Sequence, residues 1–143
     1  MPPIYLLMAG ATMLALHFLL PVAMLIPFPW RLCGLALLAA GVLLNILADQ
    51  SLKRHHTTVK PFERSTTLIT DGVFSISRNP MYIGMALFLA GIAVFLGSLS
   101  PWFMVAVFIA LIDQVFILRE ELKLRETFGS VYEEYEKSVR RWF

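Results

Sequence analysis

The stretch LITDGVFSISRNPMYIG, residues 68–84, organises the whole chain, because a polar, turn-rich segment runs directly into an apolar one. Pro80 suits a helix start, where the backbone N–H groups have no partner within the helix. Asn79 then takes the cap position. The amides of the first turn, including that of Tyr82, form the positive end of a helix dipole and predict a site for a carboxylate or phosphate. The alternative is an ordinary proline-started helix that binds no ligand.

The composition indicates an integral membrane protein. Of the 143 residues, 58% are hydrophobic and 15% are charged, and the mean hydropathy is +0.72. These values are too apolar for a soluble domain. The formal net charge of +2 is too small to indicate nucleic-acid binding. Cys33 is the single cysteine, so an intrachain disulfide and a cysteine-based metal cluster are both excluded.

Four apolar runs predict an all-α, polytopic membrane protein with about four transmembrane helices in one domain, residues 1–143. A hydrocarbon core about 30 Å thick takes about 20 residues per helical crossing. The expected spans cover residues 4–26, 32–48, 81–99 and 102–118, and an amphipathic C-terminal helix follows over residues 119–137. The segment 50–79 is the one substantial polar loop. The first run begins with prolines rather than basic residues, which predicts a retained span and not a signal peptide.

The basic residues predict the orientation. Arg31 lies alone in the first connection, five basic residues lie in the 50–79 loop, and six follow Leu118. By the positive-inside rule, the loop, the C-terminal helix and the N-terminus are expected in the cytosol, as in a bacterial inner-membrane protein whose active site faces inward. The three tryptophans are expected to lie at the membrane interfaces. They are Trp30, Trp102 and Trp142.

Acidic residues on the fourth span are candidates for chemistry. Asp113 lies within that span, where a carboxylate costs about 2.5–3.5 kcal/mol and needs a partner. On a regular α-helix, Asp113 and Glu120 lie two turns apart on one face, which predicts a polar stripe that reaches the cytosolic mouth. The alternative is that Asp113 bonds to Asn45 or His17 for packing, while Glu120 and Glu121 start a solvated helix.

The histidines do not predict a metal site. His17 stands alone in the first span, without a second ligand nearby in the sequence. His55 and His56 are adjacent, so their side chains diverge and do not easily share one ion.

Two segments carry a resemblance to a known family. They are LITDGVFSISRNPMYIG, residues 68–84, and EELKLRETFGSVYEEYEKSVRRW, residues 120–142, with an apolar hairpin between them. Together they resemble the isoprenylcysteine carboxyl methyltransferase and phospholipid methyltransferase family, over residues 64–142. The resemblance implies an integral membrane enzyme that takes S-adenosylmethionine from the cytosol. Its acceptor would be a lipophilic small molecule or a lipid that arrives from the bilayer.

The resemblance also implies residue roles. The cofactor-binding residues would be Thr66, Thr67, Leu68, Ile69, Phe74, Arg78, Asn79, Pro80, Met81, Tyr82 and Glu120. Methyl transfer is an in-line displacement that needs positioning and no nucleophilic residue. An amine or thiol acceptor would gain from a general base, and the catalytic candidates are Asp113, Glu120 and Glu121.

Two positions depart from the family pattern. Asn79 stands where eukaryotic members have a histidine, although bacterial relatives share the RNP form. Phe116 stands one turn before the glutamate pair, where carboxyl-methylating members carry an arginine. An amine, a thiol or another lipid head group therefore fits better than a prenylcysteine carboxylate. Two rival functions stay open: an NADPH-dependent membrane sterol or enone reductase, and a non-catalytic membrane subunit. The sequence names neither the acceptor nor the oligomeric state.

Overall fold

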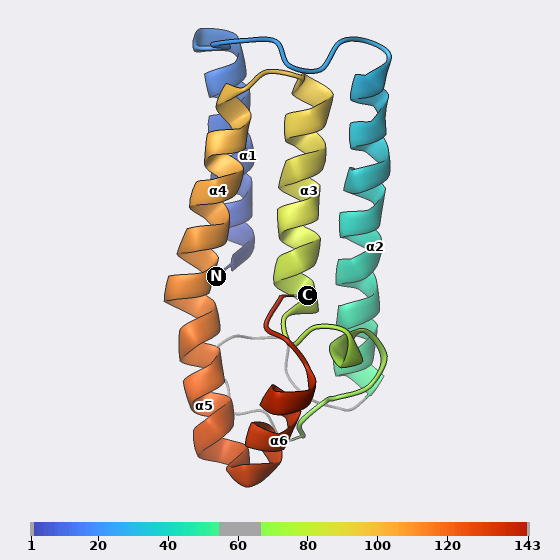
Figure 1. The fold of residues 1–143 in the computed structure, drawn as a ribbon, viewed down its shortest axis with the longest axis vertical. Helices are drawn as coiled ribbons and strands as arrows, with labels where there is room; N and C mark the ends of the chain where they lie inside the picture. The colour runs from blue at the N-terminus through green and yellow to red at the C-terminus, as the bar shows by residue number, and fades with distance from the viewer. Residues whose placement is uncertain (1, 55–66, 143) are drawn as a thin grey trace.

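The computed structural model describes residues 2–54 and 67–142, and every regular element in these ranges is a helix (Figure 1). The α-helices are α1 (Pro2–Leu19), α2 (Cys33–Arg54), α3 (Pro80–Leu96), α4 (Ser100–Ile112), α5 (Leu118–Phe128) and α6 (Ser130–Ser138). The short elements are η1 (Trp30–Leu32), η2 (Gly72–Ser75) and the π-helix η3 (Asp113–Ile117), which joins α4 to α5. The predicted all-α fold is confirmed over the described residues.

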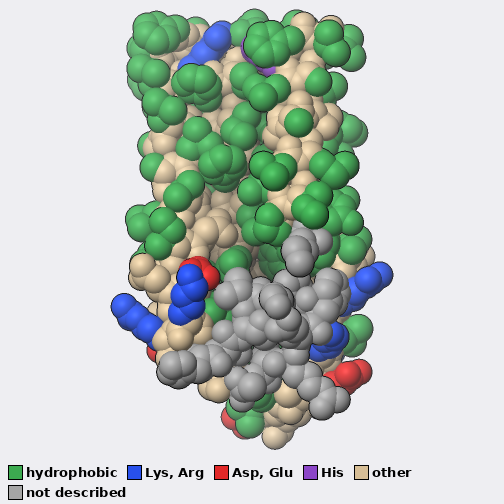
Figure 2. All heavy atoms as spheres, turned by 180° about the vertical axis from the view of Figure 1, so that it is seen from behind, with side chains coloured by type: hydrophobic (Ala, Val, Ile, Leu, Met, Phe, Trp, Pro, Cys, Tyr) green, Lys and Arg blue, Asp and Glu red, His purple; other side chains and the backbone are tan. Residues whose placement is uncertain are grey.

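Three of the helices are long and apolar enough to cross a membrane, namely Pro2–Leu19, Trp30–Arg54 and Ser100–Phe128. The apolar α3, with 17 residues, is shorter and lies between α2 and α4 in the same bundle (Figure 1). On the face seen in Figure 2, hydrophobic side chains cover most of the bundle, while the charged side chains gather mainly at one end. We call this the polar end, and it contains the start of α3, α5 and α6 (Figure 1). The prediction of a helical membrane protein is confirmed.

Glycines bring α2 and α3 into backbone contact. A Cβ atom added to Gly41 would lie 2.5 Å from the carbonyl oxygen of Gly84, and one added to Gly34 would lie equally close to that of Gly91. Any side chain at these positions would therefore push the helices apart. Small residues serve this purpose in membrane bundles, where tight van der Waals packing replaces the hydrophobic effect. The contact fixes α3 against α2, and α3 begins at the last residue of the RNP motif, Arg78-Asn79-Pro80.

The apolar core lies on the other side of α3, where it meets α1 and α4. Met13, Leu89 and Ile112 are fully buried there, one from each of the three helices. Tyr82 and Phe116 extend the same cluster toward the polar end. The core therefore continues up to the residues that were predicted to carry chemistry.

The predicted first span, residues 4–26, is too long, because α1 ends at Leu19. Pro21 has no N–H group to donate and disfavours helical backbone at the residue before it. The other spans shift by a few residues: α2 continues to Arg54, and α3 stops at Leu96. Gly97 ends α3 with φ of 75°, a left-handed conformation that glycine adopts at low cost.

The predicted C-terminal helix, residues 119–137, is wrong as a single element. Residues Ser100–Phe128 form one 29-residue helix with a π-turn inside it. This helix ends before Gly129, where φ is 53°. At about 1.5 Å per residue this helix is about 44 Å long, well beyond a hydrocarbon core of about 30 Å. Its last turns therefore project from the bundle, and α6 folds back beside them (Figure 1).

Candidate functional site

The first turn of α3 meets α5 at the polar end. The hydroxyl of Tyr82 donates a hydrogen bond to Oε1 of Glu120 at 2.7 Å, and Tyr82 is only 6% exposed. The two residues come from the two separate segments that carry the family resemblance. The structure thus brings these segments together around one phenol and one carboxylate, which we call the Tyr82–Glu120 pair.

The start of α3 differs from the prediction in its hydrogen bonds. Pro80 occupies the first turn and Asn79 the cap position, as expected, but the Asn79 side chain does not cap the helix. It donates instead to the carbonyl of Arg141 at 3.1 Å. The backbone N–H groups of Tyr82 and Ile83 both bond to the Asn79 carbonyl, at 3.1 and 3.2 Å. The expectation that the Tyr82 amide is available to an anion is therefore wrong.

The C-terminal tail, residues 139–142, returns from α6 and runs beside the RNP motif. The backbone N–H of Arg78 donates to the carbonyl of Arg140 at 3.0 Å. The hydroxyl of Ser77 donates to the carbonyl of Arg141, also at 3.0 Å. With the Asn79 bond described above, three consecutive residues hold the tail, so the tail forms one wall of the polar end.

Glu121 is a buried carboxylate compensated by two guanidinium groups. Arg141 donates to it from Nε at 3.0 Å and from Nη2 at 2.6 Å. Arg78 Nη1 lies 3.1 Å from the same carboxylate, and the two side chains are only 9% and 6% exposed. Glu121 therefore joins α5 to Arg78, just before α3, and to Arg141 in the C-terminal tail.

The Arg78 guanidinium also reaches α6. Its Nη1 donates to the Tyr132 hydroxyl at 3.1 Å and to Glu136 at 2.9 Å. Glu136 bonds Arg125 at 2.6 Å, and this bond, helped by Arg78, holds the pKa of Glu136 below its ordinary value. Burial and the charge of Glu121 raise the pKa of Tyr132, which keeps its hydroxyl protonated. Arg78 therefore ties α3, α5 and α6 together.

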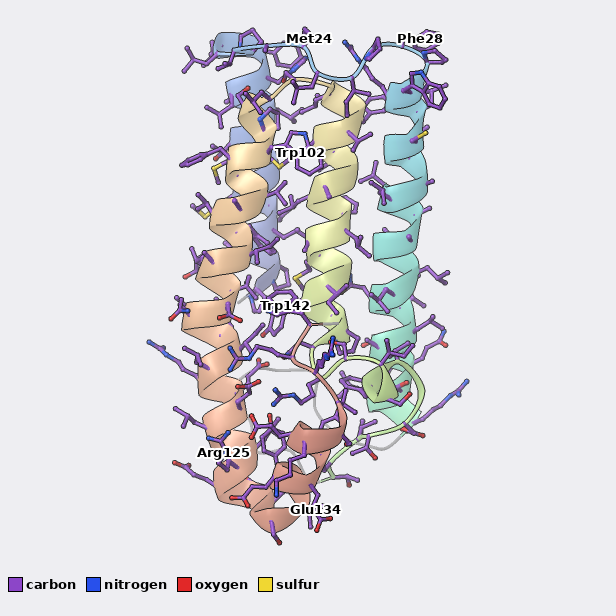
Figure 3. The ribbon with its side chains drawn as sticks, viewed as in Figure 1. Met24, Phe28, Trp102, Arg125, Glu134 and Trp142 are labelled. Carbon is purple, nitrogen blue, oxygen red and sulfur yellow. The ribbon has the colours of Figure 1, made fainter. Side chains whose placement is uncertain are left out.

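Asp113 bonds to neither Asn45 nor His17. It accepts a hydrogen bond from the indole N–H of Trp142 at 3.2 Å and faces Arg141 Nη1 at 3.4 Å. His17 lies instead 2.7 Å from the hydroxyl of Ser98, near the opposite end of the bundle. Trp142 packs against the apolar core between α3 and the long helix (Figure 3).

The remaining candidates that the structure describes lie at the same end of the bundle. Thr66, together with His55 and His56, falls outside the described residues. Thr67 is exposed, Leu68 and Met81 are half-buried, and Ile69 is buried. The carbonyl of Phe74 accepts a hydrogen bond from the Tyr135 hydroxyl at 2.6 Å, which joins η2 to α6. Among the described residues, His, Cys, Asp and Glu side chains form no group of three or more that could hold a metal ion.

The three acidic candidates differ in their partners, since two share a guanidinium and the third has a phenol. Asp113 and Glu121 face Arg141, whereas Glu120 accepts a hydrogen bond from a neutral phenol. An apolar groove of about 460 Å³ lies far from all three, at the other end of the bundle, lined by residues such as Leu16, Val22 and Trp102. The groove offers a ligand no charged group, so the chemistry points to the polar end.

The fold and the polar end define an integral membrane protein whose apolar bundle supports a buried acidic site at one end. The sequence profile of the family described as phospholipid methyltransferase matches residues 30–131, and the chain belongs to this family. The predicted resemblance is confirmed.

Two relatives extend this finding. The chain is 40% identical over 62 residues to an uncharacterized protein of Haemophilus influenzae, a match that covers 43% of this chain and 98% of that protein. It is 28% identical over 94 residues to the Schizosaccharomyces pombe protein-S-isoprenylcysteine O-methyltransferase. That match covers 66% of this chain but 39% of the yeast protein, so this chain corresponds to well under half of that relative.

Proposed function

We propose that this protein is an S-adenosylmethionine-dependent methyltransferase that methylates a lipophilic acceptor held in the membrane. The observation that carries the proposal is the 2.7 Å bond between Tyr82 and Glu120. It joins the two segments of the family resemblance in one site, at the end of an apolar bundle. Membership of the phospholipid methyltransferase family supports the reaction class.

The residues present at the polar end fit S-adenosylmethionine, which carries a carboxylate, an ammonium group and a sulfonium cation. The Glu120 carboxylate suits an ammonium group or ribose hydroxyls, because charge-assisted hydrogen bonds are the stronger kind. The positive dipole end of α3 favours the donor's carboxylate by its charge alone, because the Tyr82 and Ile83 amides already bond to Asn79. The aromatic faces of Phe74 and Tyr82 suit a sulfonium cation. The bound donor would supply an electrophilic methyl group, which the acceptor attacks in line with the departing sulfur.

Among the acidic residues, Glu120 is the best candidate to accept a proton from the acceptor. Asp113 and Glu121 are both engaged by the Arg141 guanidinium, whereas Glu120 lies beside the Tyr82 hydroxyl. In this account they act as positioning residues: Arg141 and Arg78 fix Glu121, and Glu121 fixes the helix turn that carries Glu120.

The acceptor is proposed to be an amine or a thiol rather than a carboxylate. Phe116 is 3% exposed and packs edge-to-face against Tyr5, with ring centroids 5.4 Å apart. It therefore belongs to the core and presents no cation at the position where carboxyl-methylating members carry an arginine. The guanidinium groups of Arg78 and Arg141 are already bound to Glu121.

The distribution of basic residues supports a cytosolic polar end. Eleven of the twelve lysines and arginines lie in the 50–79 segment or after Leu118, and the described part of both regions lies at the polar end. By the positive-inside rule, this end faces the cytosol, where the methyl donor is available. A bacterial inner membrane is the location that we propose.

A binding titration separates this function from its rivals. The purified protein, in detergent or nanodiscs, is titrated with S-adenosylmethionine and, in parallel, with NADPH. We expect saturable binding of the methyl donor, with a dissociation constant in the range of about 1 μM to 1 mM that is usual for enzyme substrates. Saturable binding of NADPH alone would favour a reductase, and binding of neither compound would favour a non-catalytic subunit.

A further inference from the structure

The long helix contains one turn that is wider than the rest. Within residues Asp113–Ile117 the helix is a π-helix, and the backbone N–H of Leu118 donates to the carbonyl of Asp113, five residues back. The α4 and α5 segments on either side are regular α-helices. Such a π-bulge holds one extra residue within an otherwise continuous helix, and bulges of this kind are found frequently at functional sites.

The extra residue changes which side chains share a face. An α-helix advances about 100° per residue. Glu120 comes eight residues after Ile112, so on an uninterrupted α-helix the two would point about 80° apart. One additional residue in the turn brings Glu120 back to within about 20° of Ile112. Ile112 is fully buried in the core cluster that also contains Tyr82, so this shift turns Glu120 toward Tyr82.

The contacts of Arg141 report the same shift independently. Its guanidinium bonds Glu121 at 2.6 Å and faces Asp113 at 3.4 Å. These acids are eight residues apart, a spacing that would separate them by about 80° on a regular helix. The predicted stripe, which paired Asp113 with Glu120 two turns on, is therefore wrong by one residue. Asp113 shares a partner with Glu121, and Glu120 faces α3.

We propose that the π-turn is the positioning element that keeps Glu120 opposite Tyr82 for binding of the methyl donor, because it takes up eight residues in the rotation of seven. This inference rests on the function proposed above and adds that the rotation of Glu120 relative to Ile112 matters. Gln114 is the exposed member of the turn, so its side chain can be altered separately from the spacing it supplies.

Three variants test spacing against side-chain identity. Deletion of Gln114 leaves seven residues from Ile112 to Glu120, and we expect the segment to close into a regular α-helix on which Glu120 stays within about 20° of Ile112. The second variant keeps the π-turn and inserts one alanine between Leu118 and Arg119, which rotates Glu120 by about 100° away from Tyr82. The control, Gln114→Ala, loses the side chain but keeps the spacing. Each is assayed for S-adenosylmethionine binding by calorimetry and for folding by thermal unfolding in the same detergent.

We expect the insertion to weaken donor binding about 10- to 100-fold, the loss typical of a hydrogen bond to a charged group. The deletion and Gln114→Ala should both bind within about threefold of the parent protein. A folded insertion variant that binds like the parent would overturn the inference, as would a deletion variant that does not bind. If the insertion variant fails to fold, unchanged binding by the folded deletion variant still supports the role of the turn. Absence of binding by the parent protein would instead contradict the proposed function.

Discussion

The Glu120→Gln substitution is expected to weaken S-adenosylmethionine binding about 10- to 100-fold, because hydrogen bonds to charged groups contribute about 1.5–3 kcal/mol. Glutamine keeps the size of the side chain and can still accept the hydrogen bond from Tyr82, now 2.7 Å long. What it loses is the negative charge that would hold the donor's ammonium or hydroxyl groups. Calorimetric titration of the purified variant measures this loss directly.

The matched control is Glu126→Gln, which removes the same charge from an exposed position on the same helix. It should bind the methyl donor like the parent protein. Thermal unfolding of both variants separates a local loss of binding from a loss of fold. A Glu120→Gln variant that binds within about threefold of the parent would exclude Glu120 from the site.

Arg78→Met is expected to destabilise the folded protein by about 3 kcal/mol or more, because the buried Glu121 loses one of its two cations and hydrogen bonds to charged groups contribute about 1.5–3 kcal/mol each. Glu121 is only 6% exposed and has Arg78 and Arg141 as its cations. Arg78 also bonds Tyr132 and Glu136, so its loss separates α6 from the start of α3. Since whole proteins are stable by only about 5–15 kcal/mol, the effect should be large. A lowered unfolding midpoint, followed by tryptophan fluorescence, is the measurement.

Arg119→Met is the control, since Arg119 is an exposed cation near the same acids. Its unfolding midpoint should remain close to that of the parent, because exposed charges contribute about 0–1 kcal/mol. Arg78→Lys keeps the charge but not the forked geometry and should fall between the two. An Arg78→Met protein as stable as the Arg119→Met protein would show that Arg78 does not hold the polar end together.

The sequence predicted the helices well because apolar runs free of charge leave few alternatives in a membrane. The errors lie where single residues decide the backbone. Pro21 ends α1 several residues before the apolar run ends, and Gly129 splits the predicted C-terminal helix in two. A glycine within a charged amphipathic pattern is a weak signal, because a helix tolerates it at a cost of about 1 kcal/mol.

The Tyr82–Glu120 pairing follows from the two family segments, but the surroundings of the pair could not be predicted. The helical period assigned Asp113 and Glu120 to one face because it assumes about 100° for every residue. The π-turn does not follow this period, and the sequence of the turn, DQVFI, has no pattern that predicts a π-helix. The tail contacts of Arg141 and Trp142 were also missed, because a short irregular segment has no period from which to infer its partners.

The central claim, that the polar end holds the methyl donor, is tested most directly by photo-cross-linking. S-adenosylmethionine with a tritiated methyl group is irradiated on the purified protein, and the labelled peptides are identified by mass spectrometry after digestion. The account predicts label in the 67–82 segment or around Glu120, suppressed by excess unlabelled donor. Competable label confined to the opposite end of the bundle, near the groove lined by Leu16, Val22 and Trp102, would contradict it.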